Sequence, residues 1–332
     1  MSQPSQLVET AHVRDPSGCE VPDAPICPLC RGTRHSRLDM VSYDDVRHVY
    51  RRILGVDIPA GECSKLEYVQ CLACDLRFFW PQICGDSGFY EKLQVFPWYY
   101  LAEKTEYRMA SRLIPAGSAV LEIGCGAGLF AGFLPGHCSY QGLEYNSEAI
   151  RKARERGLTV ELASIEDFSR SREPQFDVVC SFQVLEHVPS PGTFLAAAAR
   201  VLRPGGMLII AVPSESSFMA DEVNNVLNMP PHHVTRWTDA ALESVARVIG
   251  MQLVHLEHEV VSDLHLRPFV DTQVWQFARH KLGIRVPMVS RRASSLWARR
   301  ALRLLTLPLE KYARTRSQRP FGHSVVAAYK KV

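Results

Sequence analysis

The 332-residue sequence lacks any apolar run of about 18 residues, the length that a membrane-spanning helix requires. The first 25 residues also lack the apolar stretch of a secretory signal, and they are polar with four prolines. We therefore expect a cytoplasmic protein whose residues 1–25 form a disordered arm. In a reducing compartment, the ten cysteines favour metal binding over disulfide bonds.

Acidic residues are scarce near the C-terminal end of the sequence. Residues 265–332 contain two Asp or Glu against fifteen Lys or Arg, a local excess of +13, whereas the other 264 residues have a balance of −10. A basic region on an acidic body indicates an anionic partner, such as a phosphate group, a nucleic acid or a lipid surface.

A glycine-rich turn follows an apolar run at residues 119–123, which predicts a buried parallel strand leading into a helix. The turn contains Gly124, Gly126 and Gly128. No lysine follows them, which excludes a P-loop, and Leu129 occupies a position where a dinucleotide fingerprint has glycine. Glu122 lies near the end of this strand and Glu144 closes the next one. An acid at that second strand end can accept both hydroxyls of a ribose.

Two CxxC pairs, separated by forty residues, stand near the start of the chain. They are formed by Cys27 with Cys30 and by Cys71 with Cys74. Two intervening residues allow both thiolates of a pair to bind one ion, so the four cysteines predict a tetrahedral zinc site. Four protein ligands leave no open position, which makes this zinc structural. Unligated thiols or a redox pair are the alternatives.

Four sequence blocks occur in order between residues 107 and 259: VLEIGCGAG, GLEYN, FDVVCSFQVLEHVPSP and LRPGGMLIIAVPS. Together they resemble the class I S-adenosylmethionine-dependent methyltransferases. The segment PPHH at residues 230–233 is similar to one in the ubiquinone-biosynthesis-like branch of that family. The arrangement of a zinc module before the methyltransferase domain is similar to sugar C-methyltransferases.

The resemblance implies S-adenosylmethionine as the methyl donor and assigns roles to particular residues. Candidate catalytic or substrate-contacting bases are His187, His232 and His233, although each could instead fasten its loop by hydrogen bonds. Gln183 stands where some relatives have the first acid of a metal site, which argues against a catalytic metal. The expected cofactor-binding residues are Glu122, Gly124, Gly126, Gly128, Glu144, Tyr145, Ile165, Phe182 and Gln183.

The expected fold is α/β, with a seven-stranded Rossmann-like methyltransferase sheet, a small N-terminal zinc-binding module and a helical insertion before the last strand. The expected boundaries are residues 26–88 for the zinc module, 89–261 for the methyltransferase core, 262–322 for the basic insertion and 323–332 for the last strand. The insertion is predicted to form lid helices on the core. Apolar residues and arginines alternate in it near helical spacing, so peripheral contact with an anionic membrane is the alternative.

The leading functional hypothesis is methyl transfer to a small molecule or a sugar, including nucleotide-linked and surface-glycan acceptors. An RNA methyltransferase that uses the zinc module and the basic insertion is the second hypothesis. A nucleic acid is disfavoured as a partner, because no Asn/Asp-Pro-Pro-aromatic motif follows the fourth predicted strand and the zinc module is not strongly basic. A non-catalytic, zinc-stabilised binding protein is the third.

Overall fold

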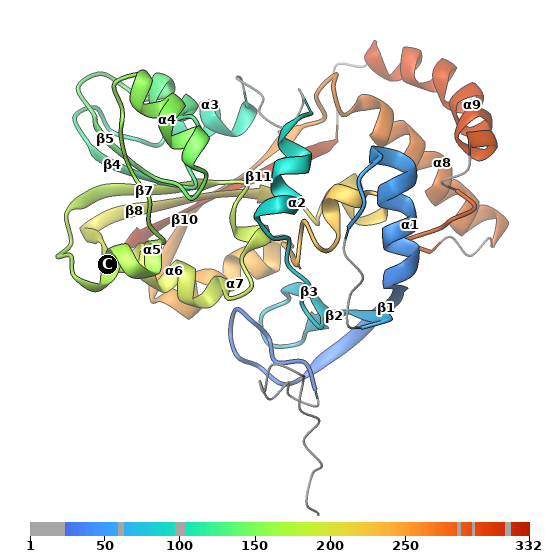
Figure 1. The fold of residues 1–332 in the computed structure, drawn as a ribbon, viewed down its shortest axis with the longest axis horizontal. Coiled ribbons are helices and arrows are strands. Elements are labelled where there is room, and N and C mark those ends of the chain that lie inside the picture. Colours follow the sequence, from blue (N-terminus) through green and yellow to red (C-terminus); the bar gives the residue numbers. More distant parts are fainter. Residues whose placement is uncertain (1–23, 59–62, 97–103, 284–286, 294–295, 316–319) are drawn as a thin grey trace, which may run out of the picture.

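The computed structural model describes residues 24–58, 63–96, 104–283, 287–293, 296–315 and 320–332 (Figure 1). The predicted arm at residues 1–25 lies almost entirely outside these ranges. The described residues form two sheets, and helices cover both faces of the larger one.

The larger sheet has the predicted seven strands. In spatial order they are β10 (Met251–Val260), β11 (Phe321–Lys331), β8 (Leu202–Pro213), β7 (Phe176–Phe182), β4 (Ala119–Ile123), β5 (Ser139–Leu143) and β6 (Thr159–Glu161). Strands β4 to β8 are parallel, and β11 runs antiparallel to both of its neighbours. The strand order reverses beside β4, so a crevice opens beyond its carboxyl end, where ligands bind in such sheets.

Alternating side chains bury both faces of this sheet, as its nearly continuous apolar strands predict. Val120 packs on one face with α3 (Thr105–Ser111) and the 3₁₀ helix η1 (Leu129–Phe133). Leu121 and Ile123 pack on the other face. That second face is covered by α5 (Ile165–Arg170), α6 (Pro191–Arg200) and α7 (Asp239–Ile249). Figure 1 shows α3 and α4 (Ser147–Glu155) above the sheet and α5, α6 and α7 below it.

Capping residues mark the helix ends. Thr238 and Gly250 are expected from their residue types to cap the two ends of α7, and they do: Thr238 accepts from the Ala241 amide, and Gly250 ends the helix at φ 66°. Ser147 is expected by the same reasoning to cap α4, and this expectation is wrong: the Asn146 side chain caps α4, and Ser147 is its first residue. Asparagine and serine are almost equally good caps, so the adjacent pair could not be resolved from sequence.

The smaller sheet belongs mainly to the predicted zinc module. Its order is β1 (His35–Ser42), β2 (Lys65–Cys71), β3 (Arg77–Trp80) and β9 (Thr235–Arg236), with antiparallel pairing throughout. Helix α1 (Tyr43–Leu54) follows β1, and α2 (Ser87–Gln94) follows β3. Strand β9 comes from the segment that follows PPHH. The module therefore shares a strand with the loop that contains His232 and His233.

The basic insertion contains two helices, α8 (Leu266–Leu282) and α9 (Leu296–Arg314). They pack on each other, and α8 also contacts the 3₁₀ helix η3 (Phe218–Asp221). Two further 3₁₀ helices, η2 (Leu185–His187) and η4 (Val226–Asn228), carry residues of the site described below. Among the described helices, none combines the length and apolarity needed to span a bilayer.

Candidate active site

A cleft of about 1330 Å³ lies at the carboxyl ends of β4, β5 and β7. Two halves of different chemistry share it. One half is lined by the glycine turn and by the ends of β5 and β7, and the other by histidines and carboxylates from α2, η2, the PPHH loop and the start of the insertion. One cleft can therefore hold a nucleoside-like ligand beside a second, polar ligand.

The glycine turn has the backbone conformation that the sequence indicates. Gly124, Gly126 and Gly128 have φ angles of 71°, 52° and 70°, a region that favours glycine. A Cβ atom on Gly124 would lie 2.4 Å from Val184 Cγ2. The turn therefore needs glycine at this position both for its φ angle and for the close approach of the η2 loop.

Glu144 is fixed beside this turn by backbone donors. Its Oε2 accepts from the Gly126 amide at 2.7 Å, and its Oε1 accepts from the amides of Tyr145 and Asn146 at 2.8 and 2.9 Å. The carboxylate lines the cleft. Because two carboxylate oxygens offer about four acceptor sites, capacity remains for ribose hydroxyls. The turn and this carboxylate fit the nucleoside part of S-adenosylmethionine.

The other expected cofactor residues fall into two groups. Tyr145, Ile165, Phe182 and Gln183 line the cleft together with Gly124, Gly126 and Glu144. Glu122 and Gly128 are not among the described lining residues. The Glu122 side chain accepts from Tyr140 Oη at 2.6 Å, and burial raises its pKa to about 8. Glu122 therefore supports the strands beneath the turn, and Gly128 packs against Leu158.

The end of β7 is held in an unusual conformation. Gln183 has a φ of 56°, which few non-glycine residues adopt, and its side chain donates to Ser324 Oγ at 3.1 Å. Phe182 precedes it and packs its ring 4.5 Å from Phe130 and 5.0 Å from Tyr107. The backbone therefore turns sharply into the η2 loop while its side chains remain anchored on both sides.

The three predicted histidines meet in the second half of the cleft, although 45 residues separate His187 from His232. Their ring centroids lie 4.5 to 4.7 Å apart. His187 Nδ1 donates to the His232 carbonyl at 2.6 Å, and His232 Nδ1 donates to the Leu227 carbonyl at 2.8 Å. These bonds place the hydrogen on Nδ1 of both rings, so Nε2 is the basic atom of each.

Glu186 was not singled out from the sequence, and it lies at the centre of the cluster. It is 1% exposed, and neither carboxylate oxygen has a hydrogen bond among the described residues. Its Oε1 lies 3.8 Å from Nε2 of both His187 and His233. Burial raises the pKa of Glu186 to about 8 and lowers the pKa of His187 to about 4. A proton gained by His187 would favour ionisation of Glu186, because the opposite charges would face each other.

A different bond sets the proton position in His233. The Asn228 side-chain oxygen accepts from Arg236 Nε at 3.1 Å. This orientation of the amide group lets its nitrogen donate to His233 Nδ1 at 3.1 Å. His233 Nδ1 is thus an acceptor, and Nε2 carries the hydrogen. His233 therefore presents an N–H group toward Glu186, whereas His187 presents a lone pair.

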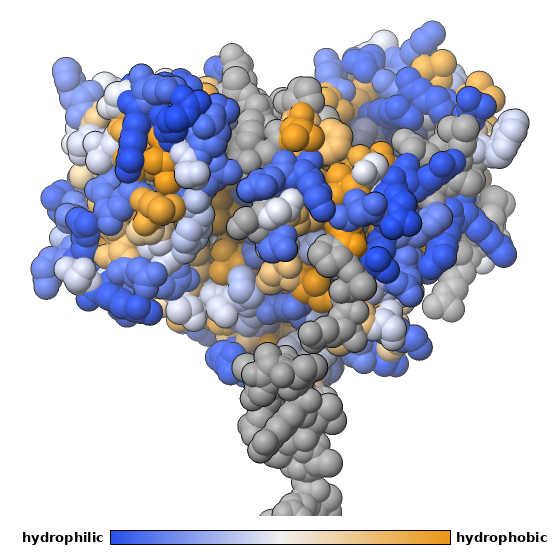
Figure 2. Space-filling view, viewed as in Figure 1, coloured by the Kyte–Doolittle hydropathy of each residue, from blue (hydrophilic) through white to orange (hydrophobic). Residues whose placement is uncertain are grey.

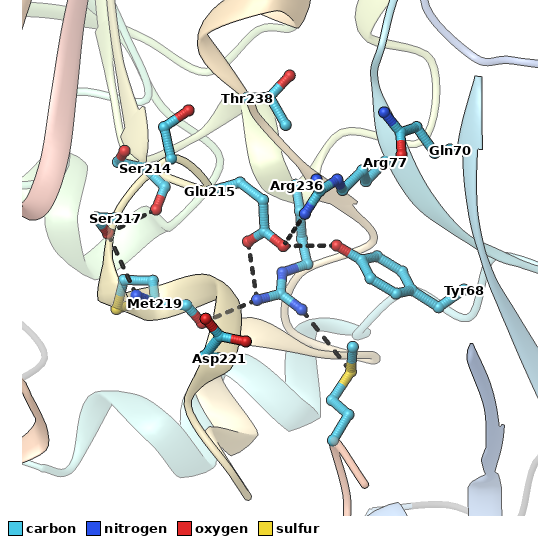
Figure 3. Close-up of polar contacts among 12 residues, drawn as sticks. Tyr68, Gln70, Arg77, Ser214, Glu215, Ser217, Met219, Asp221, Arg236 and Thr238 are labelled. Carbon is cyan, nitrogen blue, oxygen red and sulfur yellow. Dashed lines mark hydrogen bonds and ion pairs between the residues drawn. The ribbon is translucent and has the colours of Figure 1, made fainter. Parts of the chain in front are cut away.

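Arg236 is itself fixed by a buried network that joins the two sheets (Figure 3). Glu215 accepts from Tyr68 Oη at 2.7 Å, from Arg77 Nη1 at 3.1 Å and from Arg236 Nη2 at 2.8 Å. Tyr68 and Arg77 belong to the zinc module, and Glu215 follows β8 of the core. The network thus connects the module, through Arg236 and Asn228, to a histidine in the cleft.

Two groups of side chains have donor atoms close enough together to bind a metal ion. The sulfur atoms of Cys27 and Cys74 lie 3.5 Å apart, and those of Cys30 and Cys71 lie 3.6 Å apart. This spacing and a set of four thiols suit tetrahedral zinc. The three histidines also have nitrogen atoms within 4.8 Å of one another. However, His233 Nδ1 accepts from Asn228 and its Nε2 carries a hydrogen, so the cluster suits proton transfer better than metal binding.

Substitution Asn228→Asp tests the proton position in His233. An aspartate would accept a hydrogen from Nδ1 and would therefore reverse the tautomer while it keeps a partner for Arg236. We expect turnover to fall roughly 10- to 100-fold, because His233 would no longer present an N–H group toward Glu186, and an interaction with a charged group contributes roughly 1.5 to 3 kcal/mol. Nitrogen-15 NMR of the histidine rings reports the tautomer directly.

The matched control for this test is Asn224→Asp. Asn224 bonds with the Ser290 backbone through both polar atoms of its amide group, and these bonds leave the histidine cluster untouched. Unchanged His233 nitrogen shifts in Asn228→Asp would contradict the assigned tautomer.

Several other cleft residues were missed because no local pattern marks them. His323 and His265 stack at 4.9 Å between ring centroids, and Glu259 accepts from the His323 amide at 2.7 Å. Burial raises the pKa of Glu259 to about 7 and that of Glu106 above its usual range. These residues come from distant parts of the chain, and only the fold brings them together.

Comparison with known proteins gives consistent matches. The model of a methyltransferase domain family matches residues 93–256. The chain is 38% identical over 156 residues to the ubiquinone biosynthesis O-methyltransferase of Thiobacillus denitrificans, covering 42% of this chain and 67% of that protein. It is 30% identical over 165 residues to the protein of the same name from Xanthomonas axonopodis pv. citri, covering 45% and 69%. A methyltransferase structure from Archaeoglobus fulgidus matches with 17% identity and a TM-score of 0.45, covering 74% of this chain and 100% of that one.

Proposed function

Since this chain belongs to the class I S-adenosylmethionine-dependent methyltransferases, we propose that it methylates a hydroxyl group of a small molecule or sugar, with His187 as the base. The observation that carries the proposal is that one cleft contains both the glycine turn with Glu144 and the cluster of His187, His232, His233 and Glu186. The relatives named above are O-methyltransferases by name. A hydroxyl acceptor has a proton to lose, and the cluster offers a group that can take it.

S-adenosylmethionine, when bound, supplies a methyl group on a good leaving group. The protein therefore has to align the acceptor, exclude water and take the acceptor proton. His187 is suited to the last task, since its side chain is 19% exposed, against 6% for His233. His232 fixes the orientation of His187 through its carbonyl, and His233 directs its Nε2 toward Glu186 Oε1 across 3.8 Å. The three histidines thus separate into one base and two positioning residues.

The charged residues that line the cleft limit the chemical class of the acceptor. The described lining includes six glutamates and, as basic residues other than histidine, Lys104 alone. Such a lining offers an anion a single ammonium group, so it suits uncharged, hydroxyl-rich molecules better than anions, even though burial keeps Glu106, Glu186 and Glu259 partly protonated. It therefore favours a free sugar or a phenol over a nucleotide-linked sugar. It also disfavours RNA, whose phosphates would need several basic side chains near the cleft.

We also propose that Cys27, Cys30, Cys71 and Cys74 hold a structural zinc ion. The four thiols supply the donor set, and their sulfur spacing of 3.5 and 3.6 Å across the two pairs supports it.

Calorimetric titration with S-adenosylhomocysteine tests the cofactor end of the cleft. Substitution Glu144→Ala removes the carboxylate expected to bind the ribose, and we expect a 10- to 100-fold weaker affinity, from the loss of roughly 1.5 to 3 kcal/mol. Glu148→Ala is the matched control, because Glu148 is an exposed glutamate on α4 that pairs with Arg151. Equal affinity in wild type and Glu144→Ala would contradict the role of Glu144.

Methyl transfer itself is tested with [methyl-¹³C]S-adenosylmethionine and panels of phenols, free sugars, nucleotide-linked sugars and RNA. The carbon shift of the product distinguishes O-, N- and C-methylation. Products from free hydroxylated molecules would support the proposal. Cofactor binding without any product would favour the non-catalytic alternative, and products from RNA alone would favour the second hypothesis.

A further inference from the structure

Helix α9 presents an apolar face to solvent. Trp297 and Leu304 are each 78% exposed, and Leu305 and Tyr312 are each 62% exposed. Polar residues lie on the opposite side, where Thr306 is 0% and Glu310 is 8% exposed. A helix that covers a protein core normally shows the reverse arrangement.

The exposed apolar residues form one continuous stripe. Successive members are separated by three or four positions, or are neighbours on the same side of the helix, as the 3.6-residue period requires. The stripe consists of Trp297, Ala301, Leu304, Leu305, Pro308 and Tyr312. We call it the α9 stripe. Figure 1 places α9 at the outer edge of the molecule, and Figure 2 shows hydrophobic side chains among hydrophilic ones in that area.

The side of α9 opposite the stripe faces the protein. Thr306 and Glu310 are buried there, Ala313 packs against an apolar cluster that includes Phe218 and Leu266, and α9 packs along α8. The packing that holds α9 in place therefore lies mainly on the side opposite the stripe. A contiguous row of exposed apolar side chains on a protein surface indicates an interaction site.

Basic side chains border the α9 stripe. Arg300 and Lys311 are exposed beside it, and the Arg300 guanidinium lies 5.9 Å from the centre of the Trp297 ring. An apolar stripe with basic flanks and aromatic residues near both ends is typical of helices that lie in a membrane surface. A second copy of the chain would bring the same positive charges face to face, which opposes self-association through this surface.

We propose that the α9 stripe docks this protein on the surface of an anionic lipid bilayer. The apolar side chains would enter the boundary between head groups and acyl chains, and Arg300 and Lys311 would contact acidic head groups. The sequence left open whether the basic insertion covers the substrate or contacts a membrane. The exposed stripe supports the second alternative for α9, whereas α8 contacts the core.

Vesicle co-sedimentation of the full chain tests this proposal. Vesicles of phosphatidylcholine with about 30% phosphatidylglycerol are compared with vesicles of pure phosphatidylcholine. This anionic content is roughly sufficient to attract a basic protein surface. We expect the partition coefficient to be at least 10-fold larger on the anionic vesicles and to fall with added salt. Leu304→Glu combined with Leu305→Glu should reduce it at least 10-fold, because both side chains are exposed and their exchange leaves the core intact.

Leu162→Glu is the matched control, since Leu162 is 62% exposed on another part of the surface. Its partition should equal that of wild type, and Lys311→Glu should weaken binding to anionic vesicles alone. The proposal is overturned if wild type binds neither vesicle, if it binds both equally, or if Leu162→Glu reduces binding as much as the stripe variant. It is also overturned if light scattering shows a dimer that the stripe variant dissociates, because a second copy would then cover the stripe.

Discussion

His187→Gln is expected to lower kcat by roughly 10²- to 10⁴-fold, the contribution typical of a positioned general base. Affinity for S-adenosylhomocysteine should change little, because Glu144 and the glycine turn bind at the other end of the cleft. Glutamine retains a similar volume and polarity but cannot accept a proton near neutral pH. Single-turnover rates measured beside calorimetric titration separate the chemical step from cofactor binding.

The pH dependence of turnover follows from the same geometry. Burial lowers the pKa of His187 to about 4, so the neutral, basic form is present across the neutral range. As pH falls toward 4, the ring becomes protonated and turnover should decline. In Glu186→Gln the nearby carboxyl group is lost, and we expect lower turnover, since the imidazolium formed during reaction no longer has a potential carboxylate at 3.8 Å.

His48→Gln controls for replacement of a histidine as such, because His48 is exposed on α1. An unchanged kcat in His187→Gln would exclude His187 as the base. If His232→Gln lost activity and His187→Gln kept full activity, His232 would be the base.

The sequence identified those parts of the site that local pattern encodes. Gly124, Gly126 and Gly128 recur within five residues, and their positive φ angles explain why glycine is required. Glu144 could be placed because it ends the strand after this turn. The CxxC spacing likewise predicted that the four cysteines lie together, and they do. In each case, neighbours in the chain are also neighbours in space.

The remainder of the site depends on contacts between distant segments. Glu186 directly precedes His187, yet only the structure shows that His233 faces it from the PPHH loop. The pairing of β3 with β9 was also unpredictable, since β9 has only two residues and no strand pattern of its own. Strand β9 lies in the range expected for the core and pairs with β3 of the range expected for the zinc module, so residues of both ranges form one sheet.

Loss of the proposed zinc ion is expected to abolish turnover and to leave cofactor affinity within about threefold, since the cofactor-binding half of the cleft is built from β4 and β5. The zinc module supports the PPHH loop directly. Phe79 N donates to the Val234 carbonyl at 3.1 Å, and Gly85 N donates to the Pro231 carbonyl at 2.8 Å. Structural zinc sites supply folding energy, so their loss disorders the strands they hold.

The measurement is zinc content, S-adenosylhomocysteine affinity and turnover in Cys30→Ser and Cys71→Ser. Cys63→Ser is the matched control, because Cys63 lies in the same module outside the cluster. If the control keeps zinc and activity while both cluster variants lose them, the metal acts on the chemistry through the position of His232 and His233.

Substitution Glu215→Gln tests the same coupling without removing a zinc ligand. It keeps the zinc ligands but removes the buried charge that joins Tyr68 to Arg236, so reduced turnover with full zinc content would show that the network transmits the effect. Full turnover in zinc-free protein would contradict this coupling and would leave the module with a role in stability alone.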